Sequence, residues 1–290
     1  GKKRRKTMKK KLTYVAALAA AGALALTGCG KNETPQQNND VTTEAANTQT
    51  GEGDLLSQIL DKGEIVVAME GTWAPWTYHD ENDNLVGYDV EVAQLIAEKL
   101  GVKATFIEGE WDGLLAGLDA GRYDIMVNGV DITEERAEKY DFSTPYAYNR
   151  TAVIVKSDND DIQSMEDLDG KSTANTISST YAEVAEKYGA TVTGVDDLNQ
   201  TFELLLSGRI DATLNAEVTF YDYLNAHPDA PIKIATLDPE VTEVAIPVRK
   251  GEQSKSLLEA IDAAIGELRE SGELSALSEK YFGTDITNAD

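Results

Sequence analysis

The sequence predicts an α/β fold made of two lobes, and three observations support this prediction. From about residue 55 onward, short β-rich runs alternate with amphipathic helical stretches, a pattern typical of parallel sheets covered by helices. This part of the chain has about 235 residues, which suits two lobes of about 100 residues each. The third observation is a segment that occurs twice, at 118–128 and again at 205–215.

The spacing of apolar residues predicts the individual elements. The apolar run 65–69 reads as a buried strand, and 104–107 reads as the next strand. Apolar residues recur at helical spacing in 92–100, and Gly101 follows as a C-terminal stop signal. The stretch 111–118 predicts another helix.

Helices are also expected in the later parts of the chain. Thr133 is a natural N-cap for a short helix, and a second helix is expected to begin near Tyr181. Near the end, apolar residues at helical spacing in 257–268 predict a long helix that stops by Gly272.

The repeated segment carries similar residues in both copies. The copies 118–128 and 205–215 each read as a helix end, a glycine turn, a strand, and an asparagine where the strand ends. In open parallel sheets, ligands lie beyond the carboxyl ends of the strands. We therefore expect Asn128 and Asn215 to lie near one shared cleft. The alternative is that Gly-Arg-x-Asp is merely a common turn between a helix and a strand.

The N-terminal residues have the layout of a signal peptide. Three lysines at 9–11 precede the apolar run 14–26, which is too short to span a bilayer as a mature helix. Leu-Thr-Gly-Cys at 26–29 resembles a lipobox, which predicts a lipoprotein signal peptide at 1–28 and a lipidated Cys29. The alternative is an ordinary secreted protein with a chance cysteine.

A polar tether is expected to follow this signal. Residues 29–51 are mostly polar, with almost nothing to bury, so we expect them to be disordered. Met8 is the expected natural start, since 1–7 read as a tag or an upstream misreading. An anchor at Cys29 predicts a location on the outer face of the cytoplasmic membrane, as in a Gram-positive bacterium.

Composition excludes several classes of partner. The chain has 26 basic and 51 acidic residues, for a net charge of −25. Such an acidic chain is a poor ligand for nucleic acid, and its folded part is a poor ligand for anionic lipid, so the lipid anchor is the only membrane contact expected. The chain has one cysteine, so an intrachain disulfide is not possible.

The sequence contains no recognisable catalytic set. The two histidines, His79 and His227, lie in separate polar segments, and no His/Cys cluster or phosphate-binding glycine loop is present. We therefore predict a protein that is not an enzyme and that has no cofactor and no metal site. The acidic loop 78–84 crudely suggests a cation site, but its spacing is typical of a hairpin tip rather than of a calcium loop.

The segment 128–136 carries the strongest indication of binding. It places Arg136 about one helical turn beyond a strand end, and the aromatic turn 141–146 follows shortly after. A planar guanidinium held in this way is suited to gripping a carboxylate through two parallel hydrogen bonds. The alternative is an exposed arginine paired with Glu134 or Glu135.

Large aromatics and a carboxylate are expected beside it. Glu70 and Trp73 follow the first strand, and Trp111 begins a helix. Two indoles at strand ends are able to sandwich an aliphatic stem or stack on a planar group. The alternative for both Trp73 and Trp111 is plain core packing, which is also the prediction for Trp76.

Polar groups for an ammonium and a carboxylate complete the set. The Asp131 side chain and the Gly129 carbonyl are placed to accept hydrogen bonds from an ammonium group. Ser179 and Thr180 lie at an expected helix start, whose free N–H groups suit the other side of a carboxylate. The alternatives are a solvated loop acid for Asp131 and a simple N-cap at Ser179.

Taken together, these motifs resemble the amino-acid-binding members of the bacterial extracellular solute-binding proteins (family 3), over about 63–287. The resemblance implies a type II periplasmic-binding-protein-like fold with a ligand cleft between its lobes, serving an ABC importer. It also implies that Arg136 and Ser179–Thr180 hold the ligand carboxylate and that Trp73 and Trp111 flank its side chain.

The chain departs from the family pattern at one position. Relatives usually carry an aspartate for the α-ammonium where this chain has Ala216, between Asn215 and Glu217. Either Asp131, Glu70 or Glu217 substitutes for it, or the ligand is not an ordinary α-amino acid.

The expected ligand is a polar amino acid. Arg136 serves one carboxylate and spare acids favour extra ammonium groups, which disfavours glutamate and aspartate. The runs 214–217 and 140–146 look most like the cystine- or cysteine-binding branch, with basic amino acids as the alternative. We expect a monomer that delivers its ligand to an ABC permease. The rival hypotheses are a dehydratase-type enzyme, with Glu70 or Asp131 as its acid or base, and a sensor module.

The predicted lobes are discontinuous along the chain. Lobe 1 is expected to contain 52–147 and 244–290, and lobe 2 is expected to contain 148–243, so that the chain crosses the hinge twice.

Overall fold

The computed structural model describes residues 53–289. The predicted signal peptide and the whole predicted tether, Cys29 included, lie outside the described residues. Within 53–289, no helix is both long enough and apolar enough to cross a membrane.

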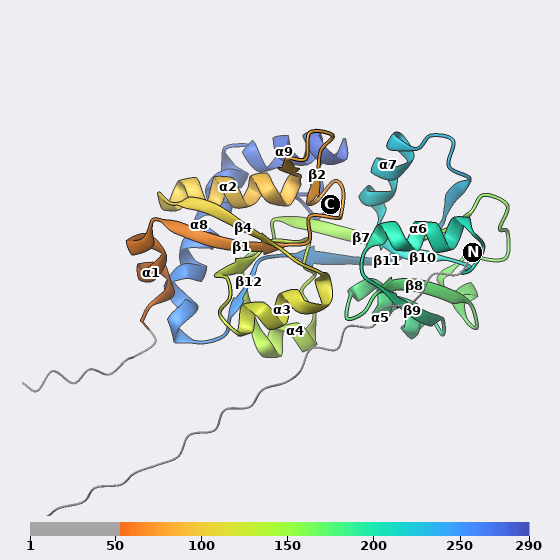
Figure 1. Ribbon diagram of the computed structural model, residues 1–290, viewed down its shortest axis with the longest axis horizontal. Coiled ribbons are helices and arrows are strands. Elements are labelled where there is room, and N and C mark those ends of the chain that lie inside the picture. The colour runs from red at the N-terminus through yellow and green to blue at the C-terminus, as the bar shows by residue number, and fades with distance from the viewer. Residues whose placement is uncertain (1–52, 290) are drawn as a thin grey trace, which may run out of the picture. The chain divides into compact units, whose positions relative to one another are not determined.

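The first lobe is built around a three-stranded parallel sheet in the order β4-β1-β5 (Figure 1). The central strand β1 (Glu64–Met69) pairs with β4 (Lys103–Glu108) on one side and with β5 (Ile125–Met126) on the other. Its predicted core position is confirmed, since Ile65, Val67 and Met69 are all buried.

Helices and short strands complete the first lobe. The predicted helix at 92–100 is the later part of α2 (Tyr88–Leu100), which ends at Gly101 with a positive φ of 74°. The others are α1 (Leu55–Lys62), α3 (Trp111–Asp119), α4 (Glu134–Lys139), α8 (Lys255–Glu270), α9 (Glu273–Phe282), the 3₁₀ turn Glu252–Ser254, and the paired strands β6 (Tyr140–Phe142) and β12 (Pro247–Arg249).

The second lobe is built on two sheets. Strand β7 lies between β10 and β11 in one sheet, and β8 pairs with β9 in the other. The bounds are β7 (Ala147–Lys156), β8 (Ser172–Thr176), β9 (Thr191–Val195), β10 (Thr213–Ala216), β11 (Ile232–Val244), α5 (Thr180–Lys187), α6 (Leu198–Leu206), α7 (Glu217–Ala226) and a 3₁₀ turn at Met165–Leu168.

The alternation of strands and helices predicted parallel α/β layers, and this prediction is wrong for the larger sheet of the second lobe. The β8–β9 pair is parallel, but β10 and β11 both run antiparallel to β7. Strands β7 and β11 run between the two groups of elements in Figure 1, with Ala147 paired to Val244 at one end of the ladder. The chain leaves the first lobe on β7 and returns on β11, so the two strands must run in opposite directions. The exact lobe boundaries stay a prediction.

The repeated segment forms the same local structure twice. Gly121 and Gly208 both have φ of +74°, a conformation that glycine adopts without strain. In the first copy, the Asp124 carboxylate accepts a hydrogen bond from Val66 N at 2.7 Å. In the second copy, Asp211 accepts one from Ser172 N at 2.8 Å. Each aspartate, which precedes its own strand, therefore ties the turn before that strand to a neighbouring strand.

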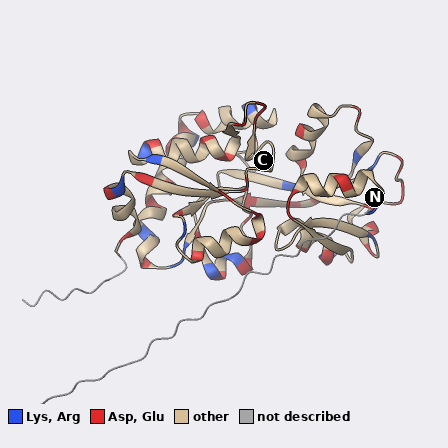
Figure 2. Cartoon of the chain, viewed as in Figure 1, with Lys and Arg blue, Asp and Glu red and all other residues tan. Residues whose placement is uncertain are grey.

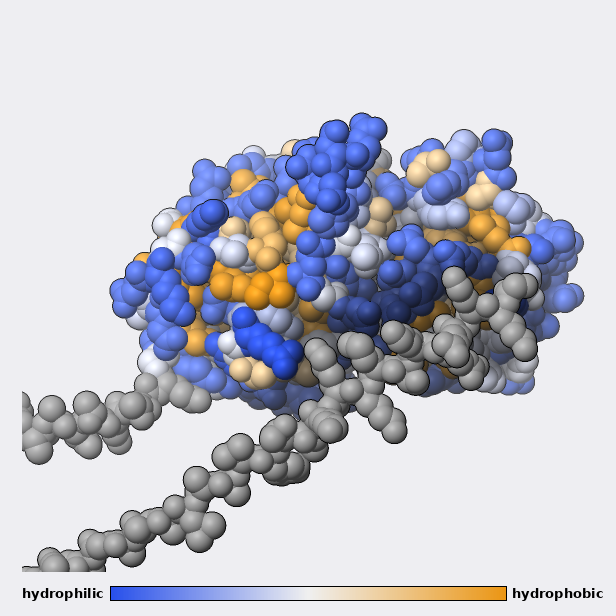
Figure 3. Space-filling model, in the orientation of Figure 1, coloured by the Kyte–Doolittle hydropathy of each residue, from blue (hydrophilic) through white to orange (hydrophobic). Residues whose placement is uncertain are grey.

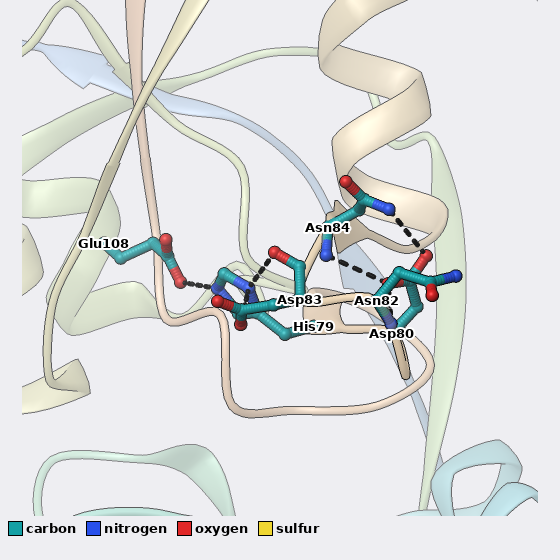
Figure 4. A network of polar contacts seen from close by, with 6 residues as sticks. All are labelled: His79, Asp80, Asn82, Asp83, Asn84 and Glu108. Atoms are coloured by element: carbon teal, nitrogen blue, oxygen red, sulfur yellow. Dashed lines mark hydrogen bonds and ion pairs between the residues drawn. The ribbon is translucent and has the colours of Figure 1, made fainter.

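The acidic loop 78–84 is the tip of a hairpin, as its spacing predicts. Strands β2 (Tyr78–His79) and β3 (Leu85–Val86) pair antiparallel, and Asp80 Oδ1 accepts hydrogen bonds from the backbone of Asn82 and Asn84 (Figure 4). No group of three or more His, Cys, Asp or Glu residues within 53–289 is arranged to hold a metal ion.

His79 joins this hairpin to the end of β4. Its Nε2 lies 2.5 Å from Glu108 Oε1, and its Nδ1 lies 3.2 Å from Asp83 Oδ1 (Figure 4). The hydrogen bond to Glu108 raises the pKa of His79, because it favours the imidazolium form.

We expect the His79 imidazole to titrate above the ordinary value of about 6.5. Since its pKa is raised on folding, its contribution to stability is present below about pH 6.5 and is lost as the pH rises through the folded pKa. An NMR titration measures the midpoint, which Glu108→Gln lowers and the neighbouring Glu110→Gln leaves unchanged. An equal midpoint in wild type and Glu108→Gln would contradict the contact.

Candidate ligand-binding site

A cavity lies where the two lobes meet, and its empty space of about 410 Å³ includes a part that is open to solvent. Ten of the eleven residues that were predicted to bind a ligand line it, and they come from both lobes. The lining residues are Glu70, Trp73, Trp111, Asn128, Gly129, Asp131, Arg136, Thr176, Ser179, Thr180, Tyr181, Leu198 and Asn215.

Arg136 is a buried cation on this cavity. Thr133 Oγ1 caps α4 by accepting from Arg136 N at 3.1 Å, which sets the helix that presents the guanidinium. Arg136 is 7% exposed and lies 5.1 Å from the Trp111 ring centroid, so the alternative of an exposed arginine is excluded. Burial lowers its pKa while Asp131 opposes this, and a guanidinium stays charged at neutral pH in either case.

The guanidinium is bound to backbone oxygens from both lobes. Its Nη1 donates to the Asp131 carbonyl at 2.8 Å, and its Nη2 donates to the Ser178 carbonyl at 3.0 Å. Neither partner carries a full negative charge. A ligand carboxylate in reach of the guanidinium would therefore find stronger, charge-assisted hydrogen bonds available.

Asp131 is a buried acid rather than a solvated loop residue. It is 2% exposed, and its two carboxylate oxygens accept from Thr242 Oγ1 at 2.8 Å and from Thr180 Oγ1 at 2.6 Å. Burial raises its pKa, and these hydrogen bonds and Arg136 work in the opposite direction. The carboxylate thereby ties the first-lobe loop to strand β11 and to the start of α5.

Glu70 and Asn128 form a reciprocal pair at the carboxyl ends of neighbouring strands. Asn128 Nδ2 donates to Glu70 Oε2 at 2.8 Å, and Glu70 N donates to Asn128 Oδ1 at 2.8 Å. Burial raises the pKa of Glu70 to about 7, with a smaller contribution from the charges of Asp197 and Asp112. Near neutral pH this carboxyl therefore exists in both protonation states.

Trp73 and Trp111 both line the cavity while being largely buried, at 6% and 8% exposed. The Trp73 indole N–H donates to Asn215 Oδ1 across the lobes at 3.0 Å. Gly129 permits this placement of Trp73, because a Cβ at Gly129 would lie 2.6 Å from Trp73 Cζ3. Trp76 is fully buried, as predicted for a core residue.

The start of α5 faces the cavity from the second lobe. Ser179 Oγ accepts from Ala182 N at 3.1 Å, so Ser179 is the N-cap, and the Thr180 hydroxyl is committed to Asp131. Ser179 therefore both caps α5 and lines the cavity.

Glu217 is the predicted site residue that lies outside this cavity. Its Oε1 accepts from Tyr221 at 3.1 Å, and it lines a separate groove beside β7 and the C-terminal segment. Ala216, next to it, is fully buried and offers no polar side chain.

Three lining residues were not predicted: Thr176, Tyr181 and Leu198. Thr176 ends β8, so the strand-end rule that found Asn128 and Asn215 would have found it too. Tyr181 follows directly after the predicted helix start, and its hydroxyl accepts from Asn149 Nδ2 at 3.0 Å. Leu198 begins α6 and has no local signal.

Beside Glu70 the cavity adjoins a strongly acidic groove. The residues lining this groove are Glu70, Thr72, Glu108, Gly109, Glu110, Asp196, Asp197 and Gln200, among which there is no lysine or arginine. Acidic residues are spread over both groups of elements in Figure 2, and the face in Figure 3 is largely hydrophilic. A cationic ligand group near Glu70 would thus lie in a negative field.

Comparisons with known proteins agree with this geometry. Residues 65–284 match the bacterial extracellular solute-binding proteins, family 3. The chain is 37% identical over 281 residues to the L-cystine-binding protein TcyA of Bacillus subtilis, covering 97% of this chain and 100% of that protein.

Two solved structures are similar to this one. An ancestral arginine-binding protein bound to arginine is 37% identical with a TM-score of 0.71, over 76% of this chain and 99% of that one. The L-cystine solute receptor of Neisseria gonorrhoeae, in its unliganded open conformation, is 40% identical with a TM-score of 0.57, over 81% of this chain and 100% of that one. The chain therefore belongs to the bacterial extracellular solute-binding proteins, family 3, which act outside the cytoplasm.

Proposed function

We propose that this protein binds a polar amino acid, L-cystine above all, and delivers it to the membrane permease of an ABC importer. The observation that carries the proposal is one cavity in which a buried guanidinium, Arg136, lies together with two carboxyl groups, Glu70 and Asp131. The relative from Bacillus subtilis is named an L-cystine-binding protein, which supports this choice of ligand.

In this proposal, Arg136 holds the ligand's α-carboxylate. Its two terminal nitrogens donate to backbone carbonyls at 2.8 and 3.0 Å, and a carboxylate would replace these neutral acceptors. The N-terminus of α5, with Ser179 as its cap, provides N–H groups on the opposite side of the same carboxylate. Trp73 and Trp111 then flank the rest of the ligand.

The carboxyl groups would hold ammonium groups. Ala216 has no acid to offer, so Asp131 and Glu70 are the proposed acceptors for the two ammonium groups of cystine. Among the described residues that line the cavity, Arg136 is the one lysine or arginine, so a second carboxylate would have to reach backbone N–H groups or solvent. This charge balance disfavours glutamate and aspartate.

A basic amino acid is the second candidate, favoured by the acidic groove beside Glu70. Competition calorimetry with cystine, arginine, lysine, glutamine and glutamate separates the candidates. We expect cystine or a basic amino acid to bind tightest, and glutamate binding tightest would overturn the charge argument.

We propose transport rather than catalysis as the role of the site. The rival is a cleft enzyme that uses Glu70, whose pKa of about 7 suits a general acid or base, or Asp131. Mass spectrometry of each bound amino acid after long incubation decides between them, because turnover would alter the ligand's mass and binding would not.

We also propose that the mature chain is a monomer anchored at Cys29 to the outer face of the cytoplasmic membrane of a Gram-positive cell. The support is the lipobox-like run at 26–29 in the sequence. We expect Cys29→Ala to abolish labelling by a radioactive fatty acid in the expressing cell, with Ser57→Ala as a control that keeps it. Labelling that persists in Cys29→Ala would contradict the anchor, and light scattering would test the monomer.

A further inference from the structure

A hydrogen bond between two side chains joins the two lobes away from the ligand cavity. Trp76 follows β1 in the first lobe, and its indole Nε1 donates to the Thr219 hydroxyl on α7 of the second lobe at 3.1 Å. Neither side chain lines the cavity. Both are buried, with Trp76 at 0% and Thr219 at 1% exposed, so the bond is shielded from water.

The donor is fixed to the first lobe by its aromatic neighbours. The Trp76 ring centroid lies 5.2 Å from that of Trp73, 5.9 Å from that of Tyr88 and 4.8 Å from that of Phe282. Residues of the first lobe thus hold the indole ring on several sides.

The acceptor is fixed to the second lobe by the packing of its helix. Thr219 lies in the first turn of α7, which begins directly after β10 and packs against β10 and β7. The bond therefore connects two rigid parts. When the lobes separate, the Trp76 indole N–H loses the Thr219 hydroxyl and can donate only to water.

Four other hydrogen bonds that side chains make between the lobes differ in one respect. They all involve residues on the cavity or next to it, so a bound ligand is able to replace or shift them: Trp73–Asn215, Arg136–Ser178, Thr180–Asp131 and Thr242–Asp131. Trp76 and Thr219 do not line the cavity, so a bound ligand does not compete for their bond.

We propose that Trp76 and Thr219 form a latch that stabilises the closed arrangement of the lobes and so sets how long a ligand stays bound. Because the latch does not touch the ligand, it strengthens the binding of every ligand by the same factor and leaves the preference among ligands unchanged. These two are positioning residues for the proposed site.

The first experiment needs no ligand. The chain has three tryptophans, so single Trp→Phe variants assign the three indole N–H signals in an NMR spectrum. We expect the Trp76 indole proton to exchange slowly with water in the wild type and in Thr219→Ser, and faster in Thr219→Val. Thr219→Val keeps the size of the side chain but removes its oxygen. Equal exchange in all three proteins would overturn the latch.

The second experiment rests on the proposed function and uses L-cystine and L-arginine as probes. In calorimetry and stopped-flow measurements, we expect Thr219→Val to weaken whichever of them binds by about 2- to 10-fold, the factor that one neutral hydrogen bond gives, mainly through faster dissociation. Thr219→Ser should bind as the wild type does.

The results distinguish a failure of the proposed latch from a failure of the proposed ligand class. If neither probe binds the wild type, the proposed ligand class fails and the indole exchange still decides on the latch. A loss in Thr219→Ser as large as that in Thr219→Val overturns the latch, as do unequal factors for two probes that bind.

Trp76→Phe removes the donor but also buried volume, so its unfolding temperature is measured beside its affinity. If the bond is real, the double variant with Thr219→Val binds no more weakly than Trp76→Phe alone, since the partner is already missing. If the losses of affinity in Trp76→Phe and Thr219→Val add up in the double variant, the proposal is overturned.

Discussion

Arg136→Ala is expected to abolish binding of the native amino acid while the fold persists. In the proposed site, this substitution leaves a desolvated ligand carboxylate without its partner, which weakens binding by roughly 2–5 kcal/mol. Calorimetry measures the loss, and thermal unfolding of the ligand-free variant shows that the fold is intact.

Two control variants sharpen this prediction. Arg122→Ala removes an exposed arginine of the same lobe and should bind as the wild type does. Arg136→Lys keeps the charge but loses the planar fork, so its affinity should fall between those of wild type and Arg136→Ala. Unchanged affinity in Arg136→Ala would remove this residue from the site.

Gly129→Ala should damage both the fold and the site. Gly129 has φ of +53°, and an added Cβ would lie 2.6 Å from Trp73 Cζ3 and 3.3 Å from Trp76 Cε3. The variant therefore combines backbone strain of about 1–2 kcal/mol with overpacking of about 1–3 kcal/mol. Moving Trp73 also displaces a wall of the cavity, so we expect ligand affinity to fall as well.

Gly101→Ala is the matched control for this change. Gly101 has φ of +74°, yet an added Cβ would meet nothing within 4 Å. Chemical denaturation should show the strain alone in Gly101→Ala and a clearly larger loss in Gly129→Ala. Equal losses would mean that the indoles give way freely and that Gly129 is needed for its backbone conformation only.

Much of the site could be predicted because strand ends are local features. Glu70 and Asn128 follow strands and Asn215 lies near the end of β10, and the rule that ligands gather at carboxyl ends predicted that these residues share one cavity. Thr133 was equally predictable, since a threonine before an acidic, helix-forming run is an N-cap signal, and it does cap α4.

The rest depended on contacts between distant parts of the chain. The antiparallel run of β7 and β11 follows from where the chain crosses between the lobes, which no local pattern records. Asp131 reads alone as a loop acid, and its partners Thr180 and Thr242 lie far along the chain. Glu217 follows β10 like a site residue, but as the first residue of α7 it lies on a different groove.

The split construction of the first lobe also determines when its core can form during synthesis. The buried face of β1 and α2, with Ile65 and Ile96, shares one apolar core with Leu257 and Ile261 of α8 and with Phe282 near the chain's end. A ribosome makes the whole second lobe before it reaches α8. The first lobe thus stays without a complete core until α8 and α9 have been made, and its folding waits on contacts of high sequence separation, which form slowly.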